Sequence, residues 1–189
     1  WAETGYGLTV GGVEVTSSNA ANITNEGKIS GTVSYNPETN TLTLNNATIE
    51  GGDYGIKYSG AETLNIVCDG DNTVTGHSYG IWTTGAGSSV SVSGTVTAAA
   101  SGANTTRGIC ASGDVTIHGD DTSVTATSGI GGDNNYGIYA NNVNITGGTV
   151  SATGELCGIY AYYNLAISGG TVTASVPGES GQAMMAEGI

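Results

Sequence analysis

The sequence contains no phenylalanine and only 2 prolines among its 189 residues. The scarcity of proline excludes a polyproline chain, and the 33 glycines show no period of three, which excludes a collagen-like helix. Valine, isoleucine, leucine, alanine, threonine, serine and asparagine are abundant instead. This composition is typical of many short β-strands joined by tight turns.

Basic residues are also scarce, with 3 lysines and arginines against 16 aspartates and glutamates. The formal net charge is −13, which disfavours nucleic acid and anionic membrane surfaces as partners, because phosphate binding needs a basic surface. No apolar run approaches the roughly 20 residues of a membrane-spanning helix. We therefore expect neither nucleic-acid binding nor membrane insertion.

The 3 cysteines are Cys68, Cys110 and Cys157, and they form no Cys-x-x-Cys pair and no zinc-binding spacing. They occupy different positions within the repeat described next, which disfavours a disulfide framework. We predict that all three are buried as small apolar side chains.

A three-part phrase repeats through most of the chain. Residues 136–152 contain Tyr-Gly-Ile-Tyr-Ala, Val-Asn-Ile-Thr, a Gly-Gly turn and Thr-Val-Ser-Ala, and residues 157–174 repeat this order with few changes. The Gly-Ile pair recurs at spacings of 25, 28, 29 and 21 residues. Strands of this length are stable only when equivalent strands stack on one another. The repeat therefore predicts a stack of coils.

The stack that this phrase favours is an all-β fold, a right-handed, single-stranded parallel β-helix of about six coils over residues 41–189. Alternation along each strand places Ile, Val and Leu inward and Thr, Ser and Asn outward. The uneven coil length disfavours a left-handed helix, which has a strict hexapeptide period. The length changes fall in loops at residues 85–89, 100–106 and 128–135, where solenoids often bind ligands.

Residues 1–40 lack the repeat and contain two hairpin patterns, with turns at Gly11-Gly12 and at residues 36–40. We predict that they form an N-terminal antiparallel hairpin cap, which covers the open end of the stack within one structural domain. The chain stops partway through a coil at Glu187-Gly-Ile189, with no capping element evident there. We expect the intact protein to be longer, or another chain to cover this end.

The residues that follow each Gly-Ile pair form one outward column of the predicted sheet. Its members are Lys57, Trp82, Cys110, Tyr139 and Tyr160, with Met185 in a degenerate sixth copy. A ladder of exposed aromatic rings suits the C–H faces of sugars. We therefore predict Lys57, Trp82, Tyr139 and Tyr160 as ligand-binding residues. The alternative is that this column packs beneath a loop.

The residues that precede each glycine form a second column, in which tyrosine recurs. Its members are Tyr54, Tyr79, Arg107, Tyr136, Cys157 and Gln182. Stacks of this kind most often stabilise a solenoid through contacts between neighbouring coils. We predict a packing role for this column and a ligand-binding role for the first.

No catalytic arrangement is recognisable. Asp120 and Asp121 are adjacent, so in a strand they would point in opposite directions and supply no carboxylate pair for glycoside hydrolysis. Lyase chemistry on acidic sugars needs a basic residue beside a cation site, but Lys57 and Arg107 lie two coils apart in different columns. His77 and His118 lie in unrelated columns, and neither has a nearby serine or cysteine in an obvious triad. We predict that the protein is not an enzyme.

A calcium site is the one cofactor that the sequence leaves open. Asp69, Asp71 and Asp120 lie in turns with asparagine and glycine, but calcium needs several converging oxygens, which the sequence does not show. Turn chemistry also explains these residues. The metal ligands therefore stay unknown, and no other cofactor is expected.

The phrases Tyr-Gly-Ile-Tyr-Ala, Val-Asn-Ile-Thr-Gly-Gly-Thr-Val-Ser-Ala and Gly-Asp-Asn-Thr-Val-Thr resemble the repeats of bacterial cell-surface β-helix proteins labelled carbohydrate-binding domain-containing. Leu8–Thr16 and Val33–Leu44 are similar to a segment that often precedes those repeats in secreted proteins. The resemblance implies a non-catalytic, pectate-lyase-like β-helix at the extracellular cell surface, within a longer surface protein. It implies a polysaccharide or surface glycan as partner and assigns no ligand residue.

The sequence thus predicts a non-catalytic cell-surface β-helix module that binds carbohydrate. The main alternative is a structural stalk or adhesin segment with a protein partner. A polysaccharide lyase or hydrolase is disfavoured by the missing carboxylate pair and the missing basic residue.

Overall fold

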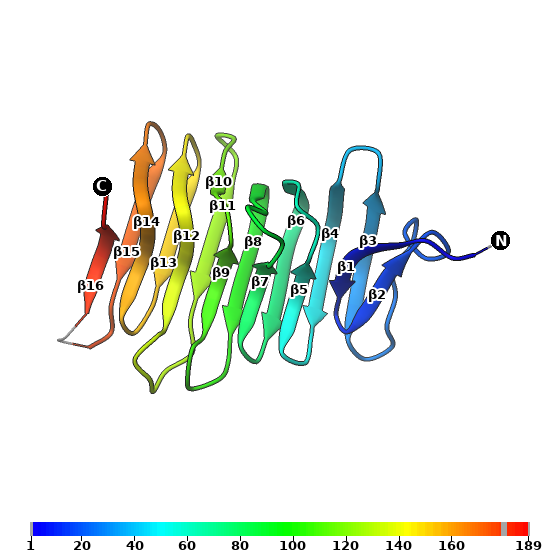
Figure 1. Cartoon of the computed structure of the whole chain (residues 1–189), viewed down its shortest axis with the longest axis horizontal. Coiled ribbons are helices and arrows are strands. Elements are labelled where there is room, and N and C mark those ends of the chain that lie inside the picture. The colour runs from blue at the N-terminus through cyan, green and yellow to red at the C-terminus, as the bar shows by residue number, and fades with distance from the viewer. Residues whose placement is uncertain (1, 179–180, 189) are drawn as a thin grey trace.

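The computed structural model describes residues 2–178 and 181–188, and these consist of strands, turns and loops. The strands stack side by side along one axis, with the N-terminus at one end and the C-terminus at the other (Figure 1). The stack is a parallel β-solenoid of about six turns. The predicted all-β parallel β-helix is therefore confirmed.

The N-terminal cap consists of β1 (Gly5–Val10), β2 (Val13–Thr16) and β3 (Ile29–Asn36). β1 and β2 form an antiparallel hairpin whose turn residues, Gly11 and Gly12, have φ angles of 54° and 81°. Tight hairpin turns require such positive φ angles, which glycine adopts without strain. β1 also pairs antiparallel with the first strand of one face, and β3 pairs antiparallel with β4 (Thr41–Glu50). The predicted antiparallel cap is confirmed.

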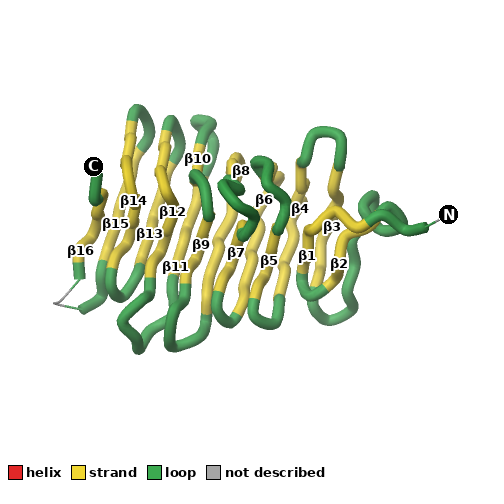
Figure 2. The backbone as a smooth tube through the Cα atoms, viewed as in Figure 1, coloured by secondary structure: helices red, strands yellow, loops and turns green. Residues whose placement is uncertain are grey.

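The coils present strands of the Gly-Ile phrase along one side of the solenoid and the remaining strands along the other two sides (Figure 2). The Gly-Ile strands are β5 (Tyr54–Tyr58), β7 (Tyr79–Thr83), β9 (Arg107–Ala111), β12 (Tyr136–Ile145), β14 (Cys157–Ile167) and β16 (Gln182–Ala186). The others are β6 (Leu64–Gly76), β8 (Val90–Ala100), β10 (Val115–Ile117), β11 (Ser123–Thr127), β13 (Thr149–Thr153) and β15 (Thr171–Ser175). Equivalent positions of neighbouring coils pair in parallel register.

β6 and β8 turn a corner without ending a strand, as do β4, β12 and β14. β6 and β8 each run through a position where the sequence pattern predicts a break between two strands. At these corners Gly70 and Gly94 have φ angles of 64° and 83°, which bend the chain while pairing continues on both sides. The prediction of separate strands there is wrong, because a single left-handed glycine changes the strand direction locally.

The core follows the inward columns that the repeat predicts. The isoleucines of the Gly-Ile pairs lie in one register column and are 0% exposed in every coil from β5 to β14, namely Ile56, Ile81, Ile109, Ile138 and Ile159. Valines and alanines from β8, β11 and β13 face them across the interior. The interior is narrow, and β-branched and small side chains fill it without phenylalanine.

The glycine of each Gly-Ile pair lies where one strand passes against the backbone of another. A Cβ atom at Gly80 would lie 2.6 Å from the Gly108 carbonyl oxygen and 2.8 Å from the Ala99 nitrogen. A Cβ atom at Gly137 would lie 2.6 Å from the Gly158 carbonyl oxygen. Backbone atoms cannot move aside as a flexible side chain can. Only glycine therefore fits at these positions, where the backbones of two strands pass each other.

The last coil leaves apolar side chains open to solvent. Ile167 is 45% exposed and Met184 is 38% exposed, whereas their register partners Ile145 and Ile159 are 0% exposed. Among the described residues, no further strand pairs with β15 or β16 on their outer side. This end of the stack is therefore uncovered within the described part of the chain.

We predict that Gly80→Ala lowers the free energy of unfolding by about 1–3 kcal/mol, because the new methyl group overlaps backbone atoms of two strands. Gly52→Ala is the matched control, since a Cβ there meets no atom within 4 Å. Denaturant melts of both variants measure the difference. Equal destabilisation of the two variants would show that the corner tolerates a side chain.

Candidate functional site

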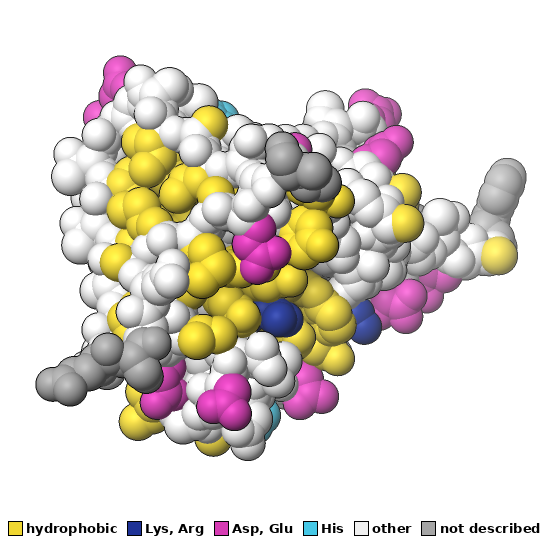
Figure 3. Space-filling view, turned by 60° about the vertical axis from the view of Figure 1, so that its left-hand side comes forward, with side chains coloured by type: hydrophobic (Ala, Val, Ile, Leu, Met, Phe, Trp, Pro, Cys, Tyr) yellow, Lys and Arg dark blue, Asp and Glu magenta, His cyan; other side chains and the backbone are white. Residues whose placement is uncertain are grey.

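Two columns of side chains lie on the outward side of the Gly-Ile strands and form one cluster, which we call the aromatic face. It consists of Tyr54, Lys57, Tyr79, Trp82, Arg107, Tyr136, Tyr139 and Tyr160. The space-filling view shows hydrophobic side chains gathered around dark blue basic side chains (Figure 3). The outward positions of β11 and β13 carry threonine and serine instead. Aromatic and basic groups therefore concentrate on one side of the solenoid.

The bend at each Gly-Ile pair brings the two columns together. Strict strand alternation would place residues three positions apart on opposite sides. Instead, the ring centroids of Tyr79 and Trp82 are 4.4 Å apart and nearly parallel, and those of Tyr136 and Tyr139 are 5.0 Å apart. The two columns are therefore not separate in space, as the sequence suggests, but belong to one cluster.

The rings of the aromatic face stack along the solenoid and cover one another. Tyr139 and Tyr160 lie in register on adjacent strands, with centroids 4.9 Å apart and planes 5° from parallel. Arg107 approaches Tyr139 from the coil on the other side, with its Cζ atom 4.3 Å from the ring centroid. Both faces of the Tyr139 ring are thus occupied. The face presents ring edges and hydroxyl groups rather than the open ring faces that the sequence suggests.

The four predicted ligand-binding residues all lie on the aromatic face but differ in burial. Lys57, Trp82 and Tyr139 are half-buried, whereas Tyr160 is 8% exposed. Tyr160 packs within a small cluster that also holds Tyr136, so the prediction that it faces solvent is wrong. Lys57, Trp82 and Tyr139 remain accessible to a ligand.

The aromatic rings hold two basic groups without a carboxylate partner. Lys57 Nζ lies 4.9 Å from the Tyr54 centroid and 5.4 Å from that of Trp82. Arg107 Nη1 donates a hydrogen bond of 3.1 Å to the Tyr79 hydroxyl, while its buried Nε has no partner. Within residues 2–178 and 181–188, neither cation forms an ion pair with aspartate or glutamate. Cation–π contacts therefore position both charges without neutralising them.

Three tyrosine hydroxyls of this face, those of Tyr79, Tyr136 and Tyr160, have raised pKa values and stay protonated at neutral pH. Burial raises the pKa of Tyr79 and of Tyr136, although the nearby Arg107 guanidinium acts in the opposite direction. Burial and a hydrogen bond to Glu187 raise the pKa of Tyr160 further. The face thus combines neutral hydroxyl groups, which donate and accept hydrogen bonds, with two positive charges.

Two long loops flank the middle of the aromatic face. Residues 101–106 lead into β9 and residues 128–135 lead into β12, and in Figure 1 these green and yellow-green loops extend beyond the neighbouring turns. Asn135 ties them together, because its side chain accepts a hydrogen bond from the Thr106 nitrogen and donates one to the Ala103 carbonyl. Ile130 is 76% exposed. These loops form a rim beside the strands that carry Arg107 and Tyr136.

The acidic residues considered for calcium do not converge with other ligands. Asp69 is exposed and accepts a hydrogen bond of 2.7 Å from the Asn45 side chain. Asp71 is exposed within β6, and Asp120 is exposed in a turn of a different coil. No group of three or more histidine, cysteine, aspartate or glutamate side chains that could hold a metal ion occurs in the described ranges.

One contact between two polar side chains is not predicted from the sequence. The His118 ring Nε2 lies 3.1 Å from the Ser91 hydroxyl, although the two residues are 27 positions apart. Coil stacking places them together on an exposed surface. Within the described part of the chain, no side chain hydrogen-bonds the other ring nitrogen of His118. A nucleophile and base without an orienting acid or an enclosing cavity do not make a catalytic triad.

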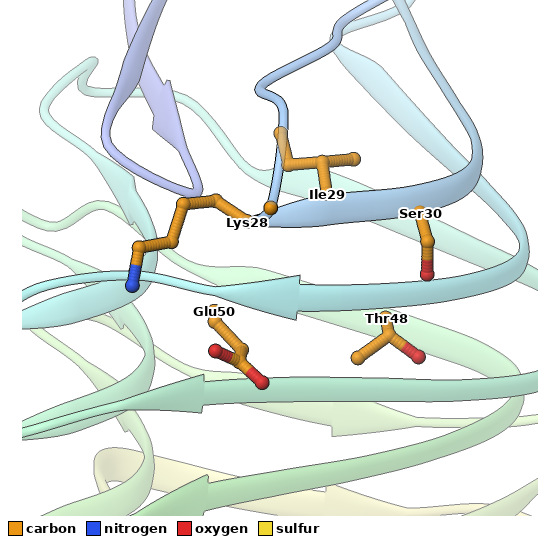
Figure 4. Close-up of a pocket in the computed structure, with 6 residues that line it drawn as sticks. Lys28, Ile29, Ser30, Thr48 and Glu50 are labelled. Carbon is orange, nitrogen blue, oxygen red and sulfur yellow. The ribbon is translucent and has the colours of Figure 1, made fainter.

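The cavity in Figure 4 lies at the cap rather than on the aromatic face. It has a volume of about 220 Å³ and lies between β3 and β4, lined by Lys28, Ile29, Ser30, Thr48 and Glu50. The Glu50 nitrogen donates a hydrogen bond of 2.8 Å to the Lys28 carbonyl, which joins the two sides. The charged lining residues are exposed, so the cavity is an open hollow at the start of the stack.

Comparisons with protein families, curated proteins and solved structures return no match for this chain. In the residues that the structure describes, no helix is long and apolar enough to cross a membrane. Function is therefore inferred from the geometry of the aromatic face.

The three cysteines are free and buried, as the sequence predicts. Burial raises the pKa of Cys68 from 9.0 to about 12, and it raises the pKa of Cys110 and of Cys157 from 9.0 to about 11. The thiolate is the reactive form of cysteine. These thiols are therefore structural groups.

We predict that iodoacetamide at pH 8 leaves all three thiols unmodified in the folded protein and alkylates all three after denaturation. Mass spectrometry of the intact protein measures the extent of modification. Rapid alkylation of the folded protein at Cys68, Cys110 or Cys157 would contradict the burial described above.

The same pKa shifts predict a fall in stability at alkaline pH. As pH rises above about 9, the thiols ionise in the unfolded chain before they ionise in the folded one, which favours unfolding. The thiol contribution to the free energy of unfolding is thus constant below pH 9 and declines as pH rises from 9 toward 11. Urea melts between pH 7 and 10.5 measure it, and a variant with all three cysteines replaced by alanine should show a shallower decline.

Proposed function

We propose that this protein is a non-catalytic β-helix module that binds a polysaccharide or surface glycan on its aromatic face. The observation that carries the proposal is the composition of that face. It gathers six aromatic side chains and two of the chain's three basic residues, although the net charge is −13. Carbohydrate sites commonly combine aromatic surface with a few fixed polar groups.

The stacking pattern defines how a glycan would make contact. Because neighbouring rings cover the Tyr139 faces, sugar rings would lie against ring edges, and sugar hydroxyls would hydrogen-bond to tyrosine hydroxyls and to the two cations. Stacked, half-buried side chains have already lost most of their rotamer freedom. Binding therefore costs less conformational entropy than it would for mobile side chains.

The repeat phrases support the proposed setting of the module. Their similarity to bacterial cell-surface β-helix proteins leads us to place it outside the cell, at the surface, as one part of a longer surface protein. An enzymatic role is disfavoured, because glycoside hydrolysis needs two carboxylates and no member of the aromatic face carries one.

A structural stalk or adhesin segment with a protein partner is the second candidate. The observation that favours it is the ladder itself, since rings that cover one another also stabilise a solenoid without any ligand. Mutation distinguishes the two candidates. Removal of the accessible rings weakens glycan binding if the face is a binding site, and has no such effect if the rings only stabilise the solenoid.

We predict that Trp82→Ala combined with Tyr139→Ala weakens glycan binding at least about tenfold, because central aromatic residues supply most of the binding free energy of such surfaces. Isothermal titration calorimetry against the polysaccharides that the native protein retains on a glycan array measures this loss. The matched control is Tyr162→Ala combined with Tyr163→Ala, which removes an exposed tyrosine pair outside the aromatic face.

The control variant should bind as the native protein does, and circular dichroism should show both variants folded. Unchanged binding by the Trp82 and Tyr139 variant would reject the aromatic face as the site. A native protein that binds no glycan on the array would favour the stalk.

A further inference from the structure

We infer that the aromatic face selects a polysaccharide that carries carboxylates and that the polymer runs along the stack of coils, with Lys57 and Arg107 contacting carboxylates of alternate sugars. This inference rests on the proposed function and adds to it the charge of the ligand, its direction and the residues that select it.

The Arg107 guanidinium has an unsatisfied capacity for hydrogen bonding. Its Cζ atom lies 4.3 Å from the Tyr139 centroid and 5.4 Å from that of Tyr136, so the rings fix its position. Its hydrogen bond to the Tyr79 hydroxyl uses one of five N–H donors, and the buried Nε has no hydrogen-bond partner. A carboxylate matches the guanidinium geometry better than a neutral hydroxyl does.

In the part of the chain that the structure describes, Lys57 and Arg107 have no acidic partner, although acidic residues are abundant in this protein. The chain has 16 aspartates and glutamates, yet no described one pairs with Arg107 or Lys57. The third basic residue, Lys28, lies at the cap. At physiological ionic strength, charges more than about 8 Å apart are largely screened. The local positive charge of the face therefore acts on a bound ligand despite the negative net charge.

The spacing of the two cations gives the ligand its direction. Lys57 lies on β5 and Arg107 on β9, which are separated by β7, so they are about 9.6 Å apart along the stack. A pyranose ring in an extended chain advances by a distance comparable to one coil step. A polymer along the stack thus places one sugar over each coil and carboxylates of alternate sugars over the two cations. Tyr79 and Trp82 would contact the sugar between them.

The charges at the other end of the face limit where an anionic chain can bind. The Glu187 carboxylate lies close enough to Tyr160 to raise the pKa of its hydroxyl. A carboxylate there repels a second one, so the favourable stretch runs from Lys57 to Tyr139. A trisaccharide is then the shortest uronic-acid oligomer that reaches both cations.

The test is calorimetry of the whole chain with oligogalacturonates of two to six sugars and with their methyl esters, which have the same backbone without charge. We expect the acid form to bind at least tenfold more tightly than the ester, with a clear gain in affinity from the disaccharide to the trisaccharide. Lys57→Gln and Arg107→Gln should each reduce the preference for acid over ester at least threefold. Lys28→Gln is the matched control, because it removes the same charge at the cap, and it should keep the preference.

Each other outcome has a distinct meaning. Equal binding of acid and ester would overturn the charge selection and leave carbohydrate binding intact. An equal loss in Lys28→Gln and Lys57→Gln would show that net charge alone acts, which also overturns the assignment. If neither form binds and a glycan array is blank, the proposed function fails as well. Lys57→Gln keeps the test decisive if Arg107→Gln does not fold, because Lys57 is only half-buried and outside the core.

Discussion

The regular spacing between paired strands determines which side chains of neighbouring coils are in contact, and the core, the glycine positions and the aromatic face all depend on it. Because each coil lies about 4.8 Å from the next, the side chain at any position meets its counterparts directly above and below. Inward isoleucines such as Ile81 and Ile109 thus become a continuous core, and glycines such as Gly80 become a column where two backbones pass closely. The same rule makes outward tyrosines such as Tyr139 and Tyr160 a stack of rings. One repeated phrase therefore generates core, corners and surface together.

The sequence was sufficient for the properties that depend on the repeat. The parallel β-helix, the antiparallel cap and the inward isoleucines follow from alternation and turn chemistry, and the burial of Cys68, Cys110 and Cys157 follows from the usual behaviour of free cysteine as a small apolar residue. The mistakes concern local bends, which alternation does not describe. The turn of the chain at Gly137 places Tyr136 beside Tyr139, and left-handed glycines carry β6 and β8 round their corners. The contact between His118 and Ser91 depends on the register of β10 against β8, in which Ser91 lies opposite Thr116.

The aromatic face serves two physical purposes with the same contacts. Stacked rings stabilise the solenoid, and they also hold Arg107 and Lys57 in fixed positions without carboxylate partners. Burial raises the pKa of Tyr79 and of Tyr136, so these hydroxyls stay neutral, and the charged members of the face, Lys57 and Arg107, are both basic. The loops that Asn135 joins then border the surface beside Arg107. A ligand would therefore meet a rigid, locally cationic surface on an otherwise acidic protein.

The most direct test of this account is hydroxyl-radical footprinting of the aromatic side chains, with and without a polysaccharide that the protein binds. Mass spectrometry of the digested protein compares oxidation at each ring. If the aromatic face is the binding surface, oxidation of Trp82 and Tyr139 falls on addition of the polysaccharide, while oxidation of the exposed Tyr162 and Tyr163 does not change. Unchanged oxidation of Trp82 and Tyr139 in the presence of bound polysaccharide would contradict the account.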